Sequence, residues 1–238
     1  MEISERQLRR LTAEVDDQHR DGMTTMASDI AELHAETRTF RADSRRAFLR
    51  KAGIGAGALT IGTSVLSFRS LLPVGAQELT DGDIAAFAES VELAAVEAYK
   101  AAAGSGKLQP AVVEVGTAFA GHHAEHAKAF GGASGGKAKG KPNAKLLEAV
   151  GGQLGGAKDQ AAILTIAYDL ENAAVATYMF ALGALKSEAA LALTASILPV
   201  ESQHAAVLGS ALGKPATEFV PSFETQDKAV DPAEFPVA

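Results

Sequence analysis

The sequence contains no cysteine and no tryptophan, and only 5% of its 238 residues are aromatic. Without cysteine the chain can form no disulfide, iron–sulfur cluster or thiolate zinc site, so nitrogen and oxygen are its strong metal ligands. Few aromatic residues beside abundant alanine and leucine favour close-packed helices over a sheet. The formal net charge of -7 argues against non-specific binding to nucleic acid, so no nucleic-acid partner is expected.

Arginine is absent after Arg69, although ten arginines occur up to that point. From Gln77 onward the only basic side chains are eleven lysines. Such a break in composition predicts that the first third of the chain has a role separate from that of the rest.

Residues 44–50, with the sequence SRRAFLR, resemble the twin-arginine export motif. The uncharged stretch at 52–68 is shorter than the roughly 20 residues of a membrane span, and the small residues at 74–76 predict cleavage after Ala76. We therefore expect residues 44–76 to be a signal segment that the twin-arginine export machinery recognises, with the protein reaching the periplasm or cell envelope. The alternatives are an uncleaved signal anchor and a buried helix.

Residues 1–43 are polar, mixed in charge and longer than a normal basic leader. Apolar residues between Ile3 and Val15 mark one weak helical stripe, but the charge density favours a solvated or disordered segment outside the functional domain. Three methionines are candidate starts of translation: Met1, Met23 and Met26.

The pattern over residues 77–213 predicts four long helices in two pairs. Short links join the helices within each pair, whereas a flexible basic loop at 131–143 and a short helix at 144–154 separate the pairs. This predicts an all-α four-helix bundle with one long crossover between its second and third helices. Residues 214–238, with four prolines, predict an extended tail. The long helices are expected at about residues 80–103, 110–130, 158–185 and 188–212, the last kinked at Pro199.

Glutamate, tyrosine and histidine recur in the same order in the two halves of this region. Glutamate and histidine side chains three residues apart on a helix share a face, and imidazole together with carboxylate suits a transition metal. The repeat therefore predicts a dinuclear metal site with pseudo-twofold symmetry. The first half carries Glu92, Tyr99, His123 and His126, and the second carries Glu171, Tyr178, Glu201 and His204.

This arrangement resembles the ferritin-like superfamily of di-metal carboxylate proteins, and more narrowly its exported members with a twin-arginine signal. The resemblance covers about residues 80–212. It implies a lone glutamate from one helix of each pair and a Glu-x-x-His motif from its partner. The metal ligands it implies are Glu92, His126, Glu171, Glu201 and His204.

His123 departs from the family pattern, because it stands where the second helix should carry a glutamate. A neutral imidazole cannot bridge two metals as a carboxylate does, and two divalent ions would be balanced by three carboxylates instead of four. We expect weaker binding at one position, His123 as a terminal ligand, or a single metal. His122 is expected beside the ligands, and Tyr99 and Tyr178 either pack in the core or hydrogen-bond a ligand carboxylate across the bundle.

The resemblance implies an exported protein that holds two iron ions, with manganese as a reasonable substitute. Two Fe²⁺ ions close together can give two electrons to O₂ or peroxide, so the expected activity is ferroxidase-like or peroxide-consuming. The alternative is a non-catalytic envelope or stress protein with a degenerate or single-metal site, because a fold alone does not decide function. A homo-oligomer is left open, and iron storage in a cage is disfavoured.

Overall fold

The computed structural model describes residues 4–37, 79–219, 228–232 and 234–237, and every regular element within these ranges is a helix. The expected all-α fold is therefore confirmed, whereas the expected signal segment at 44–76 lies outside the described residues. The helices are α1 (Glu5–Thr37), α3 (Asp81–Ala103), α4 (Pro110–Ala133), α5 (Ala144–Gly156), α6 (Gln160–Ala184), α7 (Glu188–Ala211) and α8 (Ala216–Phe219).

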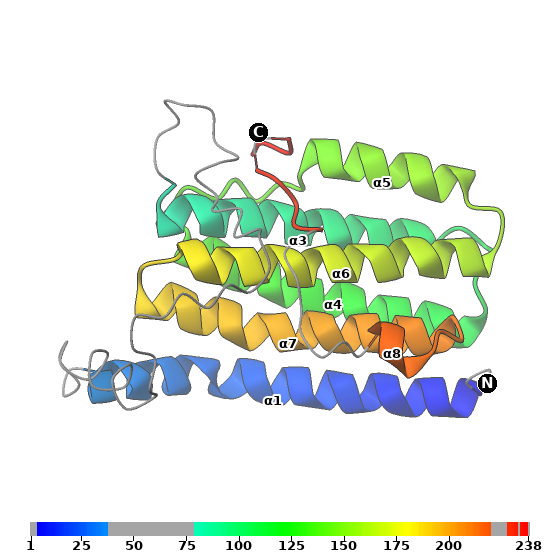
Figure 1. Ribbon diagram of the computed structural model, residues 1–238, viewed down its shortest axis with the longest axis horizontal. Helices are drawn as coiled ribbons and strands as arrows, with labels where there is room; N and C mark the ends of the chain where they lie inside the picture. The colour runs from blue at the N-terminus through cyan, green and yellow to red at the C-terminus, as the bar shows by residue number, and fades with distance from the viewer. Residues whose placement is uncertain (1–3, 38–78, 220–227, 233, 238) are drawn as a thin grey trace, which may run out of the picture. The chain divides into compact units, whose positions relative to one another are not determined.

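Four of these helices, α3, α4, α6 and α7, run side by side as a bundle (Figure 1). Short links join α3 to α4 and α6 to α7, whereas residues 134–159, which include α5, connect the two hairpins. This is the four-helix bundle with one long crossover that the sequence predicts. Among the described residues, no helix is both long enough and apolar enough to cross a membrane.

Capping residues determine where the bundle helices begin. At α3 the side chain of Thr80 accepts a hydrogen bond from the backbone N–H of Asp83, and the Asp83 carboxylate accepts one from the Thr80 N–H at 3.0 Å. The side chains of Asp159 and Ser187 cap α6 and α7. Pro110 occupies the first turn of α4, where a backbone N–H would have no helical partner. Local chemistry thus places these helix starts without help from the rest of the fold.

Helix α5 covers one side of the bundle. Its buried Leu146 and Val150 pack against Phe87 and Val91 of α3, and Val230 of the carboxyl-terminal tail packs against the same cluster. Burying each large apolar side chain stabilises the fold by roughly 1.5–3 kcal/mol. The crossover helix and the tail therefore close the α3 side of the bundle interior.

The loop between α4 and α5 is held to α3 by Glu89. Its carboxylate accepts hydrogen bonds from the backbone N–H groups of Lys139 at 3.2 Å and Gly140 at 3.1 Å. Gly131 permits this approach, because a Cβ there would lie 2.8 Å from Glu89 Oε1. The loop expected to be flexible is therefore tied down at its centre, and the buried side chain of Asn143 caps the helix that follows.

The chain divides into two compact units, one made of Met1–Thr24 with Leu79–Ala238, the other of Thr25–Glu78. Within the first unit, α1 packs on α4 and α7, and its Leu8 and Val15 belong to the bundle's apolar core. Residues 5–37 are helical where the sequence favoured a solvated or disordered segment. For residues 5–24 the difference arises because the weak apolar stripe finds a partner surface only in the folded bundle.

Candidate metal centre

All four bundle helices contribute acidic or histidine side chains to one buried region. Glu92 lies on α3, His123 on α4, Glu171 on α6 and Glu201 on α7, and each is at most 2% exposed. His126 of α4 and His204 of α7 are fully buried. The structure therefore brings all six predicted ligands together.

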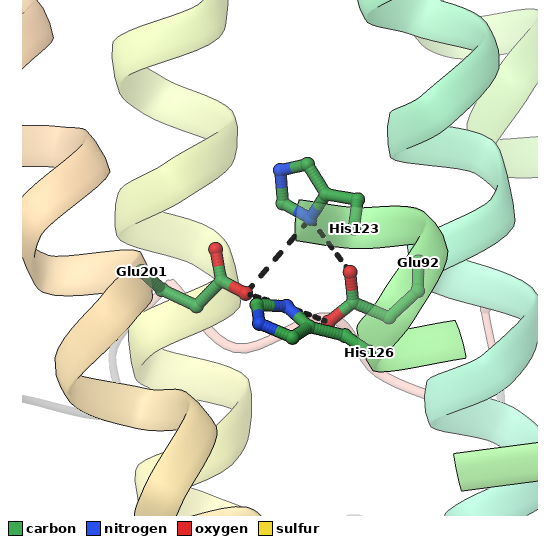
Figure 2. Close-up of side chains that lie close together, drawn as sticks. All are labelled: Glu92, His123, His126 and Glu201. Atoms are coloured by element: carbon green, nitrogen blue, oxygen red, sulfur yellow. Dashed lines mark hydrogen bonds and ion pairs between the residues drawn. The ribbon is translucent and has the colours of Figure 1, made fainter. Parts of the chain in front are cut away.

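The first group consists of Glu92, His123, His126 and Glu201, each of which offers one ligand atom within 4.8 Å of the others. Figure 2 shows these side chains converging from α3, α4 and α7. His123 Nδ1 lies 2.6 Å from Glu92 Oε2, and His126 Nδ1 lies 2.8 Å from Glu201 Oε1. Four nitrogen and oxygen donors at this spacing suit one transition-metal ion.

The second group consists of His123, Glu171, Glu201 and His204, again within 4.8 Å of one another. His204 Nδ1 lies 3.3 Å from Glu171 Oε2 and 3.2 Å from Glu201 Oε2. His123 Nε2 lies 3.2 Å from Glu171 Oε1. His123 and Glu201 thus belong to both groups, and the two ring nitrogens of His123 face one group each.

Unsatisfied polar atoms in the first group indicate that it is built for a ligand. Among the described residues, both ring nitrogens of His126 and Glu201 Oε1 lack a well-aligned hydrogen bond. His126 Nδ1 lies 2.8 Å from Glu201 Oε1, which is close enough for a hydrogen bond, so it is the angle of this contact that is poor. A short contact at a poor angle is only a weak hydrogen bond. Buried polar atoms without partners are costly, and a metal ion bound by Glu201 Oε1 and one ring nitrogen of His126 would satisfy these two atoms.

The part of the chain that carries these residues matches a known protein family. A family model described as "Ferritin-like domain" matches residues 80–214, which include α3 to α7 and all six side chains. The chain belongs to the ferritin-like family. A search of the curated proteins and a search of the solved structures gave no match.

Mutual charge stabilisation governs the ferritin-like centre in the absence of metal. Burial lowers the pKa of His126, but the charges of Glu201 and Glu92 outweigh burial and raise that pKa to about 9. The pKa of His123 is raised well above its usual value by Glu201, Glu171 and Glu92 against the same cost of burial. Conversely, burial raises the pKa of Glu92, but His123 and His126 lower it to about 2. Glu92 and these two histidines therefore hold each other in their charged forms.

Two tyrosines cross between the halves of the ferritin-like bundle. The hydroxyl of Tyr99 on α3 donates to Glu171 on α6, and the hydroxyl of Tyr178 on α6 donates to Glu92 on α3. Burial raises the pKa of both hydroxyls well above 10, with the glutamate charges adding to the effect, so both stay protonated donors. Of the two alternatives for these tyrosines, the structure places them on the carboxylates across the bundle.

His122 faces away from the two ligand groups and contacts the back of one ligand. Its Nδ1 lies 2.8 Å from His204 Nε2, and its Nε2 lies 3.1 Å from Asp16 Oδ1 on α1. The ring of His19, also on α1, stacks on His122 with centroids 4.1 Å apart. Asp16 and His19 were not among the site residues predicted from the sequence. The available signal was spacing, because Val15 and His19 are four residues apart and so share one helix face.

A small apolar cavity of about 30 Å³ lies on the other side of the centre, between α3, α6 and α5. Small side chains such as Ala94, Ala95 and Ala174 leave this space open, and Glu92 and Glu171 border it. One water molecule needs roughly 10–15 Å³ on this measure, so the cavity can hold a molecule of two or three atoms. The ligand groups therefore have an apolar flank and a histidine-rich flank.

Proposed function

We propose that this ferritin-like protein binds two transition-metal ions, iron or manganese, and reduces O₂ or peroxide in a ferroxidase-type or peroxide-type reaction. The observation that carries the proposal is the pair of buried donor groups that share His123 and Glu201, each group within 4.8 Å. When bound, a pair of Fe²⁺ or Mn²⁺ ions supplies the two electrons that reduction of O₂ to the peroxide level requires.

Each of the two donor groups would hold one of the two ions. Glu92 and His126 would hold the first ion, Glu171 and His204 would hold the second, and the shared His123 and Glu201 lie within reach of both. Carboxylate oxygen and imidazole nitrogen are donors that both iron and manganese accept. The donor set therefore fits the metals that the family implies.

The surrounding residues orient the ligands and limit access to them. Tyr99 and Tyr178 each donate to one ligand glutamate, which restricts the rotation of Glu171 and Glu92. The alanine-lined cavity beside these glutamates disfavours water and favours a small apolar molecule such as O₂. His126, which is cationic below its pKa of about 9, must release a proton before its nitrogen can bind an ion.

We further propose that the twin-arginine machinery exports the protein and that it acts in the periplasm or cell envelope. The support is the SRRAFLR sequence at residues 44–50 together with the small residues that end at Ala76. This pathway carries folded proteins, which would allow a buried metal centre to be assembled before export.

A second function is supported by the charges of the metal-free centre. Because His123 and His126 balance the nearby carboxylates, the bundle needs no metal to neutralise its interior. His123 in place of a glutamate adds to this effect. A non-catalytic envelope or stress protein, with a degenerate or single-metal site, is the function that this observation favours.

Metal analysis of protein purified from its native compartment separates the two functions. The redox function requires two equivalents of iron or manganese, lost in the Glu171→Gln/Glu201→Gln variant, and O₂ consumption when Fe²⁺ is added anaerobically and air is then admitted. One equivalent without O₂ consumption supports the second function. Protein that carries no metal and takes up none would eliminate the redox function.

A further inference from the structure

The amino-terminal helix contacts the metal centre although it lies outside the residues that match the ferritin-like family. The family match begins at residue 80, whereas residues 5–24 of α1 form one compact unit with the bundle. Leu8, Val15 and His19 on this segment are 5%, 7% and 6% exposed. Their spacing of seven and four residues places them on one face of the helix.

Polar contacts fix the position of this segment along the bundle. Arg9 Nη1 lies 2.5 Å from Glu114 Oε2 of α4, and the side-chain amide of Gln203 of α7 donates to Gln18 Oε1 at 2.8 Å. Exposed pairs of this kind add little stability, but they define register. The buried apolar face and the two polar contacts together place Asp16 opposite His122.

A continuous series of contacts runs from Asp16 to the ligand groups. Asp16 Oδ1 lies 3.1 Å from His122 Nε2, and His122 Nδ1 lies 2.8 Å from His204 Nε2. The other nitrogen of His204, Nδ1, lies 3.3 Å from Glu171 Oε2. Every ring nitrogen in this series therefore has a defined neighbour.

The acceptor at the beginning of this series determines the proton positions along it. A carboxylate only accepts, so Asp16 requires that His122 carry its proton on Nε2. In a neutral ring, His122 Nδ1 is then an acceptor and requires an N–H on His204 Nε2. That leaves His204 Nδ1 as the nitrogen whose lone pair can bind a metal, on the side that faces Glu171 and Glu201.

We propose that Asp16 is a positioning residue of the metal centre, which acts through His122 to present His204 Nδ1 to the metal. In the chain that has not been cleaved after Ala76, residues 5–24 of α1 are then a functional part of a site whose ligands all lie in the family-matching region. The proposal rests on the proposed function for the identity of His204 as a ligand. Fixing a ligand histidine through an outer carboxylate is a general feature of metal sites, and here that carboxylate comes from a separate helix.

His19 completes the arrangement by holding the plane of His122. Its ring stacks on His122 at a centroid distance of 4.1 Å and an interplanar angle of 27°, and meets the edge of His126 at 5.0 Å. Neither ring nitrogen of His19 has a hydrogen-bond partner among the described residues. Burying an imidazole in this way is unfavourable, and packing against His122 and His126 gives it a structural purpose.

The test uses the full chain, Zn²⁺ as the probe, and two neighbouring aspartates. Asp16→Asn keeps the shape of the side chain but offers a donor as well as an acceptor, so it no longer imposes one proton position on His122. Asp17→Asn is the matched control, because Asp17 also pairs with Arg20, at 3.1 Å, and its side chain is 72% exposed. Both variants weaken an Arg20 ion pair, and only one alters the contact with His122.

The expected result is a loss of Zn²⁺ affinity of about tenfold in Asp16→Asn, at the lower end for an outer partner, and none in Asp17→Asn. Ring-nitrogen NMR of the wild-type Zn²⁺ complex should show His204 bound through Nδ1 and protonated on Nε2. In Asp16→Asn the His122 ring should populate both neutral forms. If α1 had only a structural role, Asp16→Asn would lower the melting temperature of the protein without changing these nitrogen signals.

Unchanged Zn²⁺ affinity together with unchanged nitrogen signals in Asp16→Asn would overturn the proposal. Failure of the proposed function gives a different result, because the wild-type chain would then bind no Zn²⁺ at this centre. In that event the metal-free protein still tests whether Asp16 determines the proton position on His122. An Nε2-protonated His122 that depends on Asp16 supports positioning by α1, and a His122 signal indifferent to Asp16 refutes it.

Discussion

Metal binding is expected to displace protons from the centre, because His123 and His126 are cationic when no metal is present. His126 has a pKa of about 9, so at pH 7 roughly one molecule in a hundred carries it in the neutral form that binds a metal. Deprotonation therefore weakens binding about a hundredfold at pH 7, or about 2.7 kcal/mol. His123, whose pKa is also raised, adds a further penalty in the same group.

The assay is calorimetric titration of Zn²⁺ into metal-free protein between pH 6 and pH 8, in buffers that differ in ionisation enthalpy. Each imidazolium that must lose its proton contributes a tenfold gain in affinity per pH unit, so the first group should gain about a hundredfold per unit. The His126→Gln variant should release one proton fewer. A flat affinity and no proton release over this range would refute the charge assignments.

The same pKa shift predicts how the metal-free protein responds to pH. The folded-state pKa of His126 lies above its usual 6.5, so its stabilising effect is complete below pH 6.5 and is lost as pH rises through about 9. The shift corresponds to about 3 kcal/mol. Acid works against the folded state through His122, since burial lowers its pKa to about 4. Chemical denaturation should therefore show maximum stability near pH 6.5, and a maximum above pH 9 would contradict these shifts.

Three substitutions test other parts of the centre. Tyr178→Phe removes the donor to Glu92 and should cost about 1–3 kcal/mol of metal-free stability and also weaken Zn²⁺ binding. The control Tyr168→Phe, whose hydroxyl bonds a backbone carbonyl away from the site, should leave Zn²⁺ affinity unchanged in the same calorimetric titration. Ala95→Leu fills the cavity and should slow O₂ consumption by Fe²⁺-loaded protein severalfold at unchanged Zn²⁺ affinity, and an unchanged rate would show that O₂ reaches the centre elsewhere. His123→Glu supplies a fourth carboxylate, so the metal-free protein should melt several degrees lower while mass spectrometry finds two equivalents of metal more readily; a higher melting temperature would contradict the repulsion argued here.

The fold was predictable because its signals are local. The cap at Thr80 and the proline at Pro110 specify helix starts from a few adjacent residues, and the link lengths then specify the hairpins. The convergence of Glu92 and Glu171 followed from their repeated spacing. That they bind a metal remains a prediction.

The features that escaped prediction depend on contacts between distant parts of the chain. Asp16 and His122 are 106 residues apart in the sequence, and nothing local relates them. The charge density of the first 43 residues outweighed a short apolar stripe that ends at Val15, whose burial requires the surface of α4 and α7. The position of His123 between both donor groups likewise follows from helix packing.

The crossed tyrosine–glutamate bonds make each hairpin dependent on the other. Tyr99 of the first hairpin donates a hydrogen bond to Glu171 of the second, and Tyr178 of the second hairpin donates one to Glu92 of the first. Reciprocal contacts of this kind define the interface of a twofold-symmetric dimer. The polypeptide thus carries a dimer's geometry within a single chain. If the chain were cut in the crossover, the two hairpins would have to associate before the buried glutamate of either one could accept its tyrosine hydrogen bond.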